Sequence, residues 1–175
     1  GWDAEIPTTM PANNLTITAK WKINKYTVTF KDGDKVVKSA EMNYGSTITA
    51  PAVPVKEGHT FKGWQGYTDN MTLPARDVTF TAQWTINKYT LTFKNDETVY
   101  KTITQDYGTA IAKPADPTKT GYTFDGWDKE IPETMPAGDM TIKAKWTANQ
   151  YTVTFDSAGG SACDSVSVTY DRPYG

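Results

Sequence analysis

Three short motifs recur along this chain at a nearly constant spacing. Tyr-Thr-x-Thr-Phe stands at residues 26–30, 89–93 and 151–155, so its copies are 63 and 62 residues apart. Gly-x-Thr-Phe-x-Gly-Trp stands at residues 58–64 and 121–127, and the chain opens with the last two residues of this motif. A Pro-Ala dipeptide, followed by a strand-like segment that ends in tryptophan, stands at residues 11–21, 74–84 and 136–146. Self-similarity at a fixed period indicates a tandem repeat in which each copy folds as one unit.

The register of these motifs predicts the domain boundaries. We expect the C-terminal part of a truncated repeat, two complete repeats and the N-terminal part of another, at residues 1–23, 24–86, 87–148 and 149–175. The last part ends at Tyr174-Gly175, and we expect the parent protein to continue on both sides. Only four residues separate Trp84 from Tyr89, and none of them is glycine, serine or proline. Because no flexible linker intervenes, we expect neighbouring repeats to contact each other and to form an elongated array.

Each repeat is predicted to be mainly β, or α+β. Apolar and polar residues alternate through residues 26–30 and 78–84, as in strands buried on one face. Asp32-Gly33 suits a hairpin turn, and a second strand is expected at residues 36–44. A short segment at residues 46–50, and its counterpart at 109–113, is expected to form a helical turn or a plain turn before the prolines that follow. The resulting order resembles a small β-grasp (ubiquitin-like) unit of about 62 residues.

Composition argues against several classes of protein. The 18 basic and 20 acidic residues nearly cancel, which disfavours binding to nucleic acid. No apolar run approaches the ~18 residues that span a bilayer, so no membrane insertion of this piece is expected. A single cysteine, Cys163, excludes an internal disulfide framework.

Taken together, the motifs resemble the Listeria–Bacteroides repeat, also called the internalin B repeat. The matching features are Tyr-Thr-Val-Thr-Phe, Tyr-Gly, Gly-Tyr-Thr-Phe-x-Gly-Trp, Met-Pro-Ala and a final Ala-Lys-Trp. The resemblance covers the whole chain. It implies a β-grasp-like fold in secreted or cell-wall-attached bacterial proteins, where such repeats serve as spacers or adhesion modules. It brings no catalytic or cofactor residues, so we expect no enzyme and no cofactor.

The candidate sites outside the repeat pattern are few. His59 is the only histidine and is expected to be structural, because its counterpart in the next repeat is Tyr122. Cys163 is interpreted as an incidental residue, with a reactive thiol as the alternative. The acid pairs Asp32/Asp34 and Asp96/Glu97 sit at predicted turns without the spacing of a calcium loop, so no metal site is expected.

Two functions remain in competition. The first is a spacer or stalk at the bacterial cell surface, whose partners are the neighbouring repeats of the same chain. The alternative is a weak, multivalent adhesion module for a host glycan or surface protein. Its contacts are expected in the variable loop after Trp64, at Tyr67, Asp69 and Asn70, with Tyr67 exposed. The repeated tryptophans, including Trp64 and Trp127, could stack on sugars, but burial in the core is the simpler interpretation.

Overall fold

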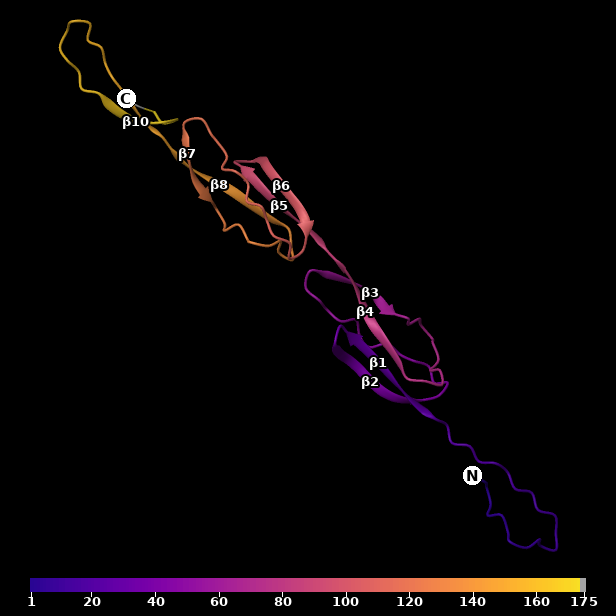
Figure 1. Cartoon of the computed structure of the whole chain (residues 1–175). Helices are drawn as coiled ribbons and strands as arrows, with labels where there is room; N and C mark the ends of the chain where they lie inside the picture. Colours follow the sequence, from indigo (N-terminus) through magenta and orange to yellow (C-terminus); the bar gives the residue numbers. More distant parts are fainter. Residues whose placement is uncertain (174–175) are drawn as a thin grey trace. The chain divides into compact units, whose positions relative to one another are not determined.

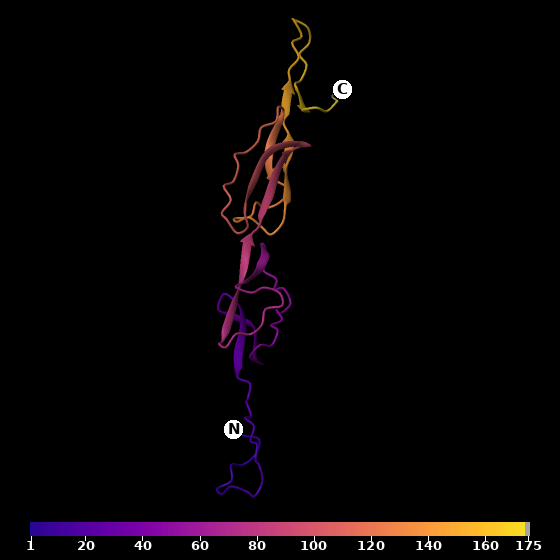
Figure 2. The same cartoon turned by 90° about the vertical axis from the view of Figure 1, so that its right-hand side faces the viewer.

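The computed structural model describes residues 1–173, and these divide into two compact units. One unit combines Gly1–Val55 with Phe61–Thr85, and the other combines Lys56–Thr60 with the chain from Ile86 onward. The short segment Lys56–Thr60 therefore belongs to the same unit as the residues from Ile86 onward, although the intervening chain belongs to the other unit. Both units are built from strands and long loops (Figures 1 and 2), and no helix occurs within residues 1–173.

The first sheet has four strands. These are β1 (Lys25–Asp32), β2 (Lys35–Asn43), β3 (His59–Gln65) and β4 (Val78–Ile86). Their order across the sheet is β2-β1-β4-β3 (Figure 1). β1 and β2 form an antiparallel hairpin, whereas the two central strands, β1 and β4, run parallel. A parallel pair needs a crossover connection, and the long loops on either side of β3 supply it.

The second sheet repeats the topology of the first. Its strands are β5 (Lys88–Asn95), β6 (Thr98–Asp106), β7 (Tyr122–Trp127) and β8 (Met140–Ala148), in the order β6-β5-β8-β7. The central pair β5 and β8 is again parallel, and β7 pairs antiparallel with β8. A separate hairpin follows, made of β9 (Gln150–Val153) and β10 (Val166–Thr169).

Alternation along the chain explains these strands. Val28 and Phe30 are buried on one face of β1, while the alternating Thr27 and Thr29 are half-buried on the other. The β1–β2 turn uses Gly33 at φ 58°, and the β5–β6 turn uses Asp96 at φ 53°. Aspartate tolerates the left-handed region better than most residues, so the second hairpin turns without glycine.

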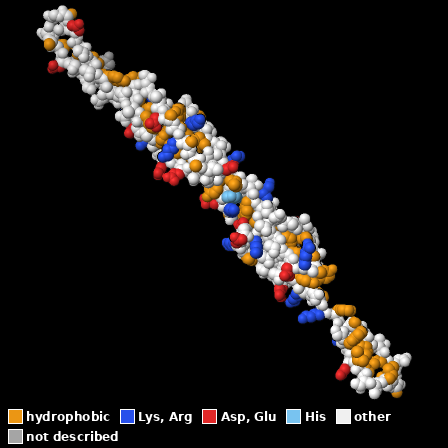
Figure 3. Space-filling model, in the orientation of Figure 1, with side chains coloured by type: hydrophobic (Ala, Val, Ile, Leu, Met, Phe, Trp, Pro, Cys, Tyr) orange, Lys and Arg blue, Asp and Glu red, His pale blue; other side chains and the backbone are white. Residues whose placement is uncertain are grey.

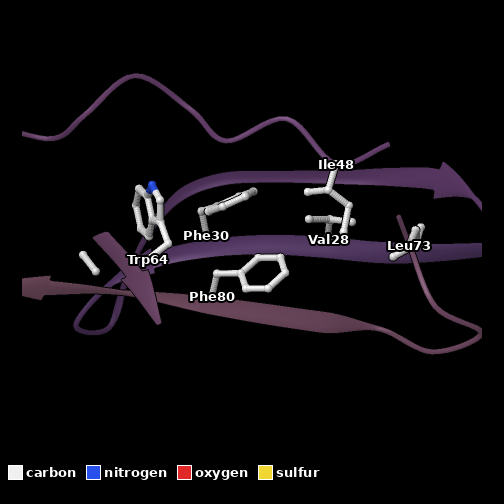
Figure 4. Close-up of a cluster of buried hydrophobic side chains, with 7 residues drawn as sticks. Val28, Phe30, Ile48, Trp64, Leu73 and Phe80 are labelled. Atoms are coloured by element: carbon white, nitrogen blue, oxygen red, sulfur yellow. The ribbon is translucent and has the colours of Figure 1, made fainter. Parts of the chain in front are cut away.

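Each sheet covers one hydrophobic core. In the first, the buried side chains come from the strands and from the loops that face them (Figure 4): Val28, Phe30, Ile48, Trp64, Leu73, Phe80 and Ala82. The Phe30 ring lies 5.0 Å from the rings of both Trp64 and Phe80. The second core is smaller and more aliphatic, with Leu91, Phe93, Met135 and Ile142 at its centre.

Trp84 and Trp146, near the ends of β4 and β8, are half-buried, and each has a partner for its polar edge. Trp84 Nε1 donates to Asp32 Oδ1 at 2.9 Å, and Trp146 Nε1 donates to Asn95 Oδ1 at 3.0 Å. Asp32 and Asn95 both end the first strand of their sheet. The hydrogen bond lets the ring pack against the core while the indole N–H stays satisfied.

The expected helical turn at residues 46–50 and 109–113 was wrong. Residues 46–48 are extended beside residues 71–73, because Ile48 N donates to Met71 O and Leu73 N donates to Ser46 O. In the second sheet Ile111 N donates to Glu133 O in the same way. Pairing with the loop satisfies these backbone groups and brings the buried Ile48 and Leu73 to the core.

The terminal parts are simpler. Residues 1–23 contain a single isolated bridge, Trp2 with Ala19, and Trp21 is 91% exposed. In the last part, Tyr151 and Phe155 are each 49% exposed. The expected end of that part at Tyr174-Gly175 lies outside the described residues. No stretch of residues 1–173 forms a helix long and apolar enough to cross a membrane.

Candidate functional site

The loop proposed to contact a ligand is only partly at the surface. Tyr67 was expected to be exposed, and this was wrong: it is half-buried and packs against the core cluster. Its hydroxyl donates to Ile48 O at 3.2 Å, and its ring meets Phe30 and Phe80 edge-on at 5.7 and 5.5 Å. In this loop Tyr67 fills core volume, which a strand-based pattern does not reveal.

The other two residues of that predicted site are exposed. Asp69 and Asn70 lie at the tip of the loop, and Asn70 adopts φ 63°. Asparagine is one of the few residues that tolerate this conformation, so Asn70 shapes the turn. A role of this loop in ligand contact stays a prediction.

His59 takes part in a recurrent loop contact. Its Nδ1 lies 2.7 Å from Glu57 O, and its ring meets the Tyr107 ring edge-on at 6.0 Å. The Tyr122 ring, at the equivalent place, meets the Tyr170 ring edge-on at 5.5 Å. Either ring therefore serves the same packing role.

We name the first of these arrangements the Asn87 clasp, formed by Gly58, Thr60, Asn87 and Tyr107 within the second unit. Asn87 N donates to Gly58 O at 2.9 Å, and Tyr107 N donates to Asn87 O at 2.9 Å. The Thr60 hydroxyl donates to Asn87 Oδ1 at 2.6 Å. Asn87 thus uses its main-chain N–H, its main-chain carbonyl and its side chain to hold two other segments.

Gly58 is required by the clasp for two reasons. Its φ of 66° lies in the left-handed region, and a Cβ built on it would overlap Cγ and Cδ1 of the Tyr107 ring. The half-buried Tyr107 ring lies flat against the glycine backbone, where any side chain would displace it.

A second clasp repeats the first almost atom for atom. We name it the Asn149 clasp, formed by Gly121, Thr123, Asn149 and Tyr170. Asn149 N donates to Gly121 O at 2.9 Å, Tyr170 N to Asn149 O at 2.8 Å, and the Thr123 hydroxyl to Asn149 Oδ1 at 2.6 Å. A Cβ on Gly121 would overlap the Tyr170 ring. The pattern analysis missed the clasps, although the recurrence of asparagine at residues 24, 87 and 149 is visible in the sequence.

Of the acid pairs at the hairpin turns, Asp96 and Glu97 are both engaged by lysines, and Asp32 accepts from Trp84. Asp96 forms an ion pair with Lys119 at 2.9 Å, and Glu97 forms one with Lys143 at 3.1 Å. The hydrogen bond and charge of Lys143, aided by Lys94, lower the pKa of Glu97 below its ordinary value. No cluster of three or more metal-ligating side chains occurs among residues 1–173.

Cys163 is exposed and unpaired as a disulfide, with its Sγ 3.9 Å from Ser161 O. Elsewhere on the surface, acidic and basic side chains are interspersed on the face that Figure 3 shows, with no extended patch of one sign.

A hollow of about 400 Å³ opens beside Trp127 in the second unit. The lining residues come from the loop before β7 and the loop after it: Lys113, Pro114, Asp116, Trp127, Asp128, Lys129, Glu130 and Ile131. Trp127 is half-buried here, whereas its counterpart in the first sheet, Trp64, is 7% exposed.

Comparison with known proteins decides the family. The model of the Listeria-Bacteroides repeat domain matches residues 26–88, 89–145 and 151–175, which together make up most of the chain. The chain belongs to the Listeria-Bacteroides repeat family. The matched ranges begin close to the starts of β1, β5 and β9, so each sheet corresponds to one match.

Among curated proteins, the chain is 37% identical over 174 residues to a putative membrane protein of Evansella cellulosilytica, covering 89% of this chain. It is 39% identical over 145 residues to internalin H of Listeria monocytogenes, covering 71% of this chain. The chain spans about a quarter of each relative, namely 26% and 25% of their lengths.

Two solved structures are similar at a lower level. One holds domains 3–4 of the Streptococcal High Identity Repeats in Tandem (SHIRT) from a cell surface protein, at 20% identity and a TM-score of 0.32. The other is Mub-RV, at 9% identity and a TM-score of 0.24. Each match covers 71% of this chain and 98% of the other chain.

Proposed function

We propose that these Listeria-Bacteroides repeats are spacer modules of a bacterial cell-surface protein. In this role they hold another part of the parent protein away from the cell. The observation that carries the proposal is the clasp, which recurs with the same hydrogen bonds around Asn87 and Asn149. A recurring contact that holds backbone segments together supports a structural role.

The way the clasp is placed along the chain supports this role. β4 ends at Ile86 and β5 begins at Lys88, so Asn87 alone separates them. The partners of Asn87 lie on both sides of it in sequence, in Lys56–Thr60 and at Tyr107. We propose that so short a connection, without a flexible linker, limits bending between successive repeats and stiffens the array.

The finer description of the fold belongs to the same proposal. A mixed sheet of order 2-1-4-3 with parallel central strands resembles the sheet of a β-grasp unit, with an extended crossover in place of the helix, and this likeness supports the proposal. We propose that the unit is a reduced β-grasp that recurs about every 62 residues. We also propose an extracellular or cell-wall location and no enzymatic activity or cofactor.

A relaxation measurement tests the spacer proposal. The 15N relaxation of the two sheets is compared in the whole chain, using amides of β1 and β4 against those of β5 and β8. If the one-residue connection is stiff, both sheets report one common anisotropic tumbling. Two short and independent correlation times would contradict the proposal. The variant Asn87→Gly, which removes the side-chain acceptor, should loosen the coupling, and Asn70→Gly at an unrelated turn should not.

A second function is proposed on a different observation. The stretches that follow Trp64 and Trp127 differ in sequence, and only the second borders the hollow beside Trp127. Loops that vary on a constant scaffold are where recognition commonly resides. We propose that the same repeats act as a weak, multivalent adhesion module for a host glycan or surface protein.

A further inference from the structure

We propose that the hollow beside Trp127 is a binding site for one uncharged saccharide residue. The inference rests on the adhesion module proposed above and names its site and ligand class. The volume of about 400 Å³ lies within the range of roughly 300–1,000 Å³ that is typical of small-ligand pockets. All of the lining residues lie in the second unit, so the site is complete within it.

The lining of the hollow combines apolar and charged side chains, and the apolar ones are Pro114, Trp127 and Ile131. The indole is held by three rings, because Phe93 and Phe124 meet it edge-on at 5.1 and 5.2 Å and Tyr100 lies tilted at 6.3 Å. An indole fixed in this way can pack against the C–H face of a sugar at little cost in side-chain entropy.

The lining also carries charged groups of both signs, and only some of them bond to other protein groups. Lys129 donates to Thr141 O, and the Asp128 carboxylate accepts from Lys143 N, so these two are engaged. Within residues 1–173 no hydrogen bond or ion pair engages Lys113, Asp116 or Glu130.

This chemistry selects the ligand class. Carboxylates accept hydrogen bonds from sugar hydroxyls, and an ammonium group donates to hydroxyl or ring oxygens. The mixture of signs is unfavourable for a polyanion, since Asp116 and Glu130 would repel it. A hollow lined by both an indole with apolar neighbours and charged groups of both signs therefore fits an uncharged sugar.

The first sheet differs from the second at the corresponding place. There the loop after Trp64 sends Tyr67 into the core, whereas the loop after Trp127 sends the smaller Ile131. Tyr67 packs on Phe80, and the corresponding strand position in the second sheet is Ile142. Two aliphatic side chains in place of two aromatic rings leave less volume filled beside the tryptophan.

The test uses the whole chain and defined sugars. Methyl β-galactopyranoside, methyl β-glucopyranoside and N-acetylglucosamine are titrated up to about 50 mM, above the millimolar Kd of a weak module. The Trp127 indole N–H signal and saturation transfer to the sugar ring are recorded. We expect at least one sugar to shift that signal saturably, while the signal of Trp64 stays in place.

Variants locate the site. Ile131→Tyr should close the hollow and abolish the shift. Asp116→Asn and Glu130→Gln keep an oxygen that accepts a hydrogen bond but lose its charge, which roughly halves the strength of a charge-assisted bond. Each should therefore raise Kd by about fivefold. Asp125→Asn, an exposed acid on β7 outside the hollow, is the matched control and should leave Kd unchanged. Far-ultraviolet circular dichroism shows which variants keep the fold. If Ile131→Tyr does not fold, the two surface variants, Asp116→Asn and Glu130→Gln, test the site.

The outcomes separate the site from the function it serves. If no sugar shifts the Trp127 signal, or if Asp116→Asn and Glu130→Gln bind as the wild type does, the proposed site is overturned. Binding of multi-repeat arrays to a mucin-coated surface that survives both substitutions would keep the adhesion function and remove this site from it.

Discussion

Replacing Gly58 by alanine should destabilise the second unit far more than the same change at another glycine of similar backbone conformation. Gly58 has φ 66°, so alanine there suffers left-handed strain of about 1–2 kcal/mol. Its Cβ would also overlap the Tyr107 ring, and forcing a side chain into a packed site costs about 1–3 kcal/mol more. The expected total is about 2–5 kcal/mol in the free energy of unfolding.

Gly108→Ala is the matched control for this prediction. Gly108 has φ 74°, but nothing lies within 4 Å of the Cβ it would gain, so only the strain of about 1–2 kcal/mol applies. Urea unfolding is followed by the amide signals of Leu91 and Phe93, which lie in the core of the second unit. Hydrogen exchange at the Tyr107 amide reports the clasp itself.

A double-mutant cycle isolates the role of the ring. In a Tyr107→Ala background the overlap is gone, so Gly58→Ala should cost no more than Gly108→Ala does. The coupling between Gly58 and Tyr107 is then the difference between the two costs of Gly58→Ala. Equal costs of Gly58→Ala in both backgrounds would refute the argument that close approach of the ring requires glycine.

Three further changes test other parts of the account. Asn87→Ala removes the acceptor of a 2.6 Å hydrogen bond and should cost about 1 kcal/mol; unchanged hydrogen exchange around the clasp would contradict this. Phe93→Ala empties a fully buried position and should cost about 3–5 kcal/mol in urea unfolding, whereas Phe155→Ala, at the same motif position but 49% exposed, should change stability little. Lys143→Gln should return the pKa of Glu97 toward 4.5 in a carboxyl NMR titration. Because the pKa of Glu97 is lowered in the folded protein, its stabilising contribution is complete above pH 4.5 and is lost as the pH falls through the folded pKa. A Lys143→Gln variant in which the pKa of Glu97 stays lowered would refute Lys143 as the main cause.

Sequence patterns predicted the strands because the cause of those strands is local. The alternation through Val28 and Phe30 sets which face of β1 is buried, and Asp-Gly sets the hairpin. The expected helical turn failed because the partner of Ile48 is Met71, in a loop more than twenty residues away. Nothing in the five residues from 46 to 50 indicates that pairing.

The candidate sites were predicted less well, for a similar reason. Tyr67 stands in a polar loop, so its sequence neighbours suggest exposure. Its ring nevertheless packs edge-on against Phe80 in the core. Likewise, the Tyr107 ring is what requires glycine at residue 58, and these two residues are 49 positions apart in the sequence. The hollow beside Trp127 depends on which side chain of the following loop packs into the core. The periodicity of the sequence does not predict which side chain this is.

The spacer proposal is tested most directly by small-angle X-ray scattering on arrays of two, four and six complete repeats. Units of this size have a radius of gyration of about 11 Å, so a stiff array should lengthen by roughly 25–35 Å with each added repeat. The account predicts that the maximum dimension rises linearly with repeat number. It also predicts that replacing Asn87, and its counterpart in every other repeat, by glycine reduces the slope. A maximum dimension that grows only as the square root of repeat number, or a compact particle, would contradict it.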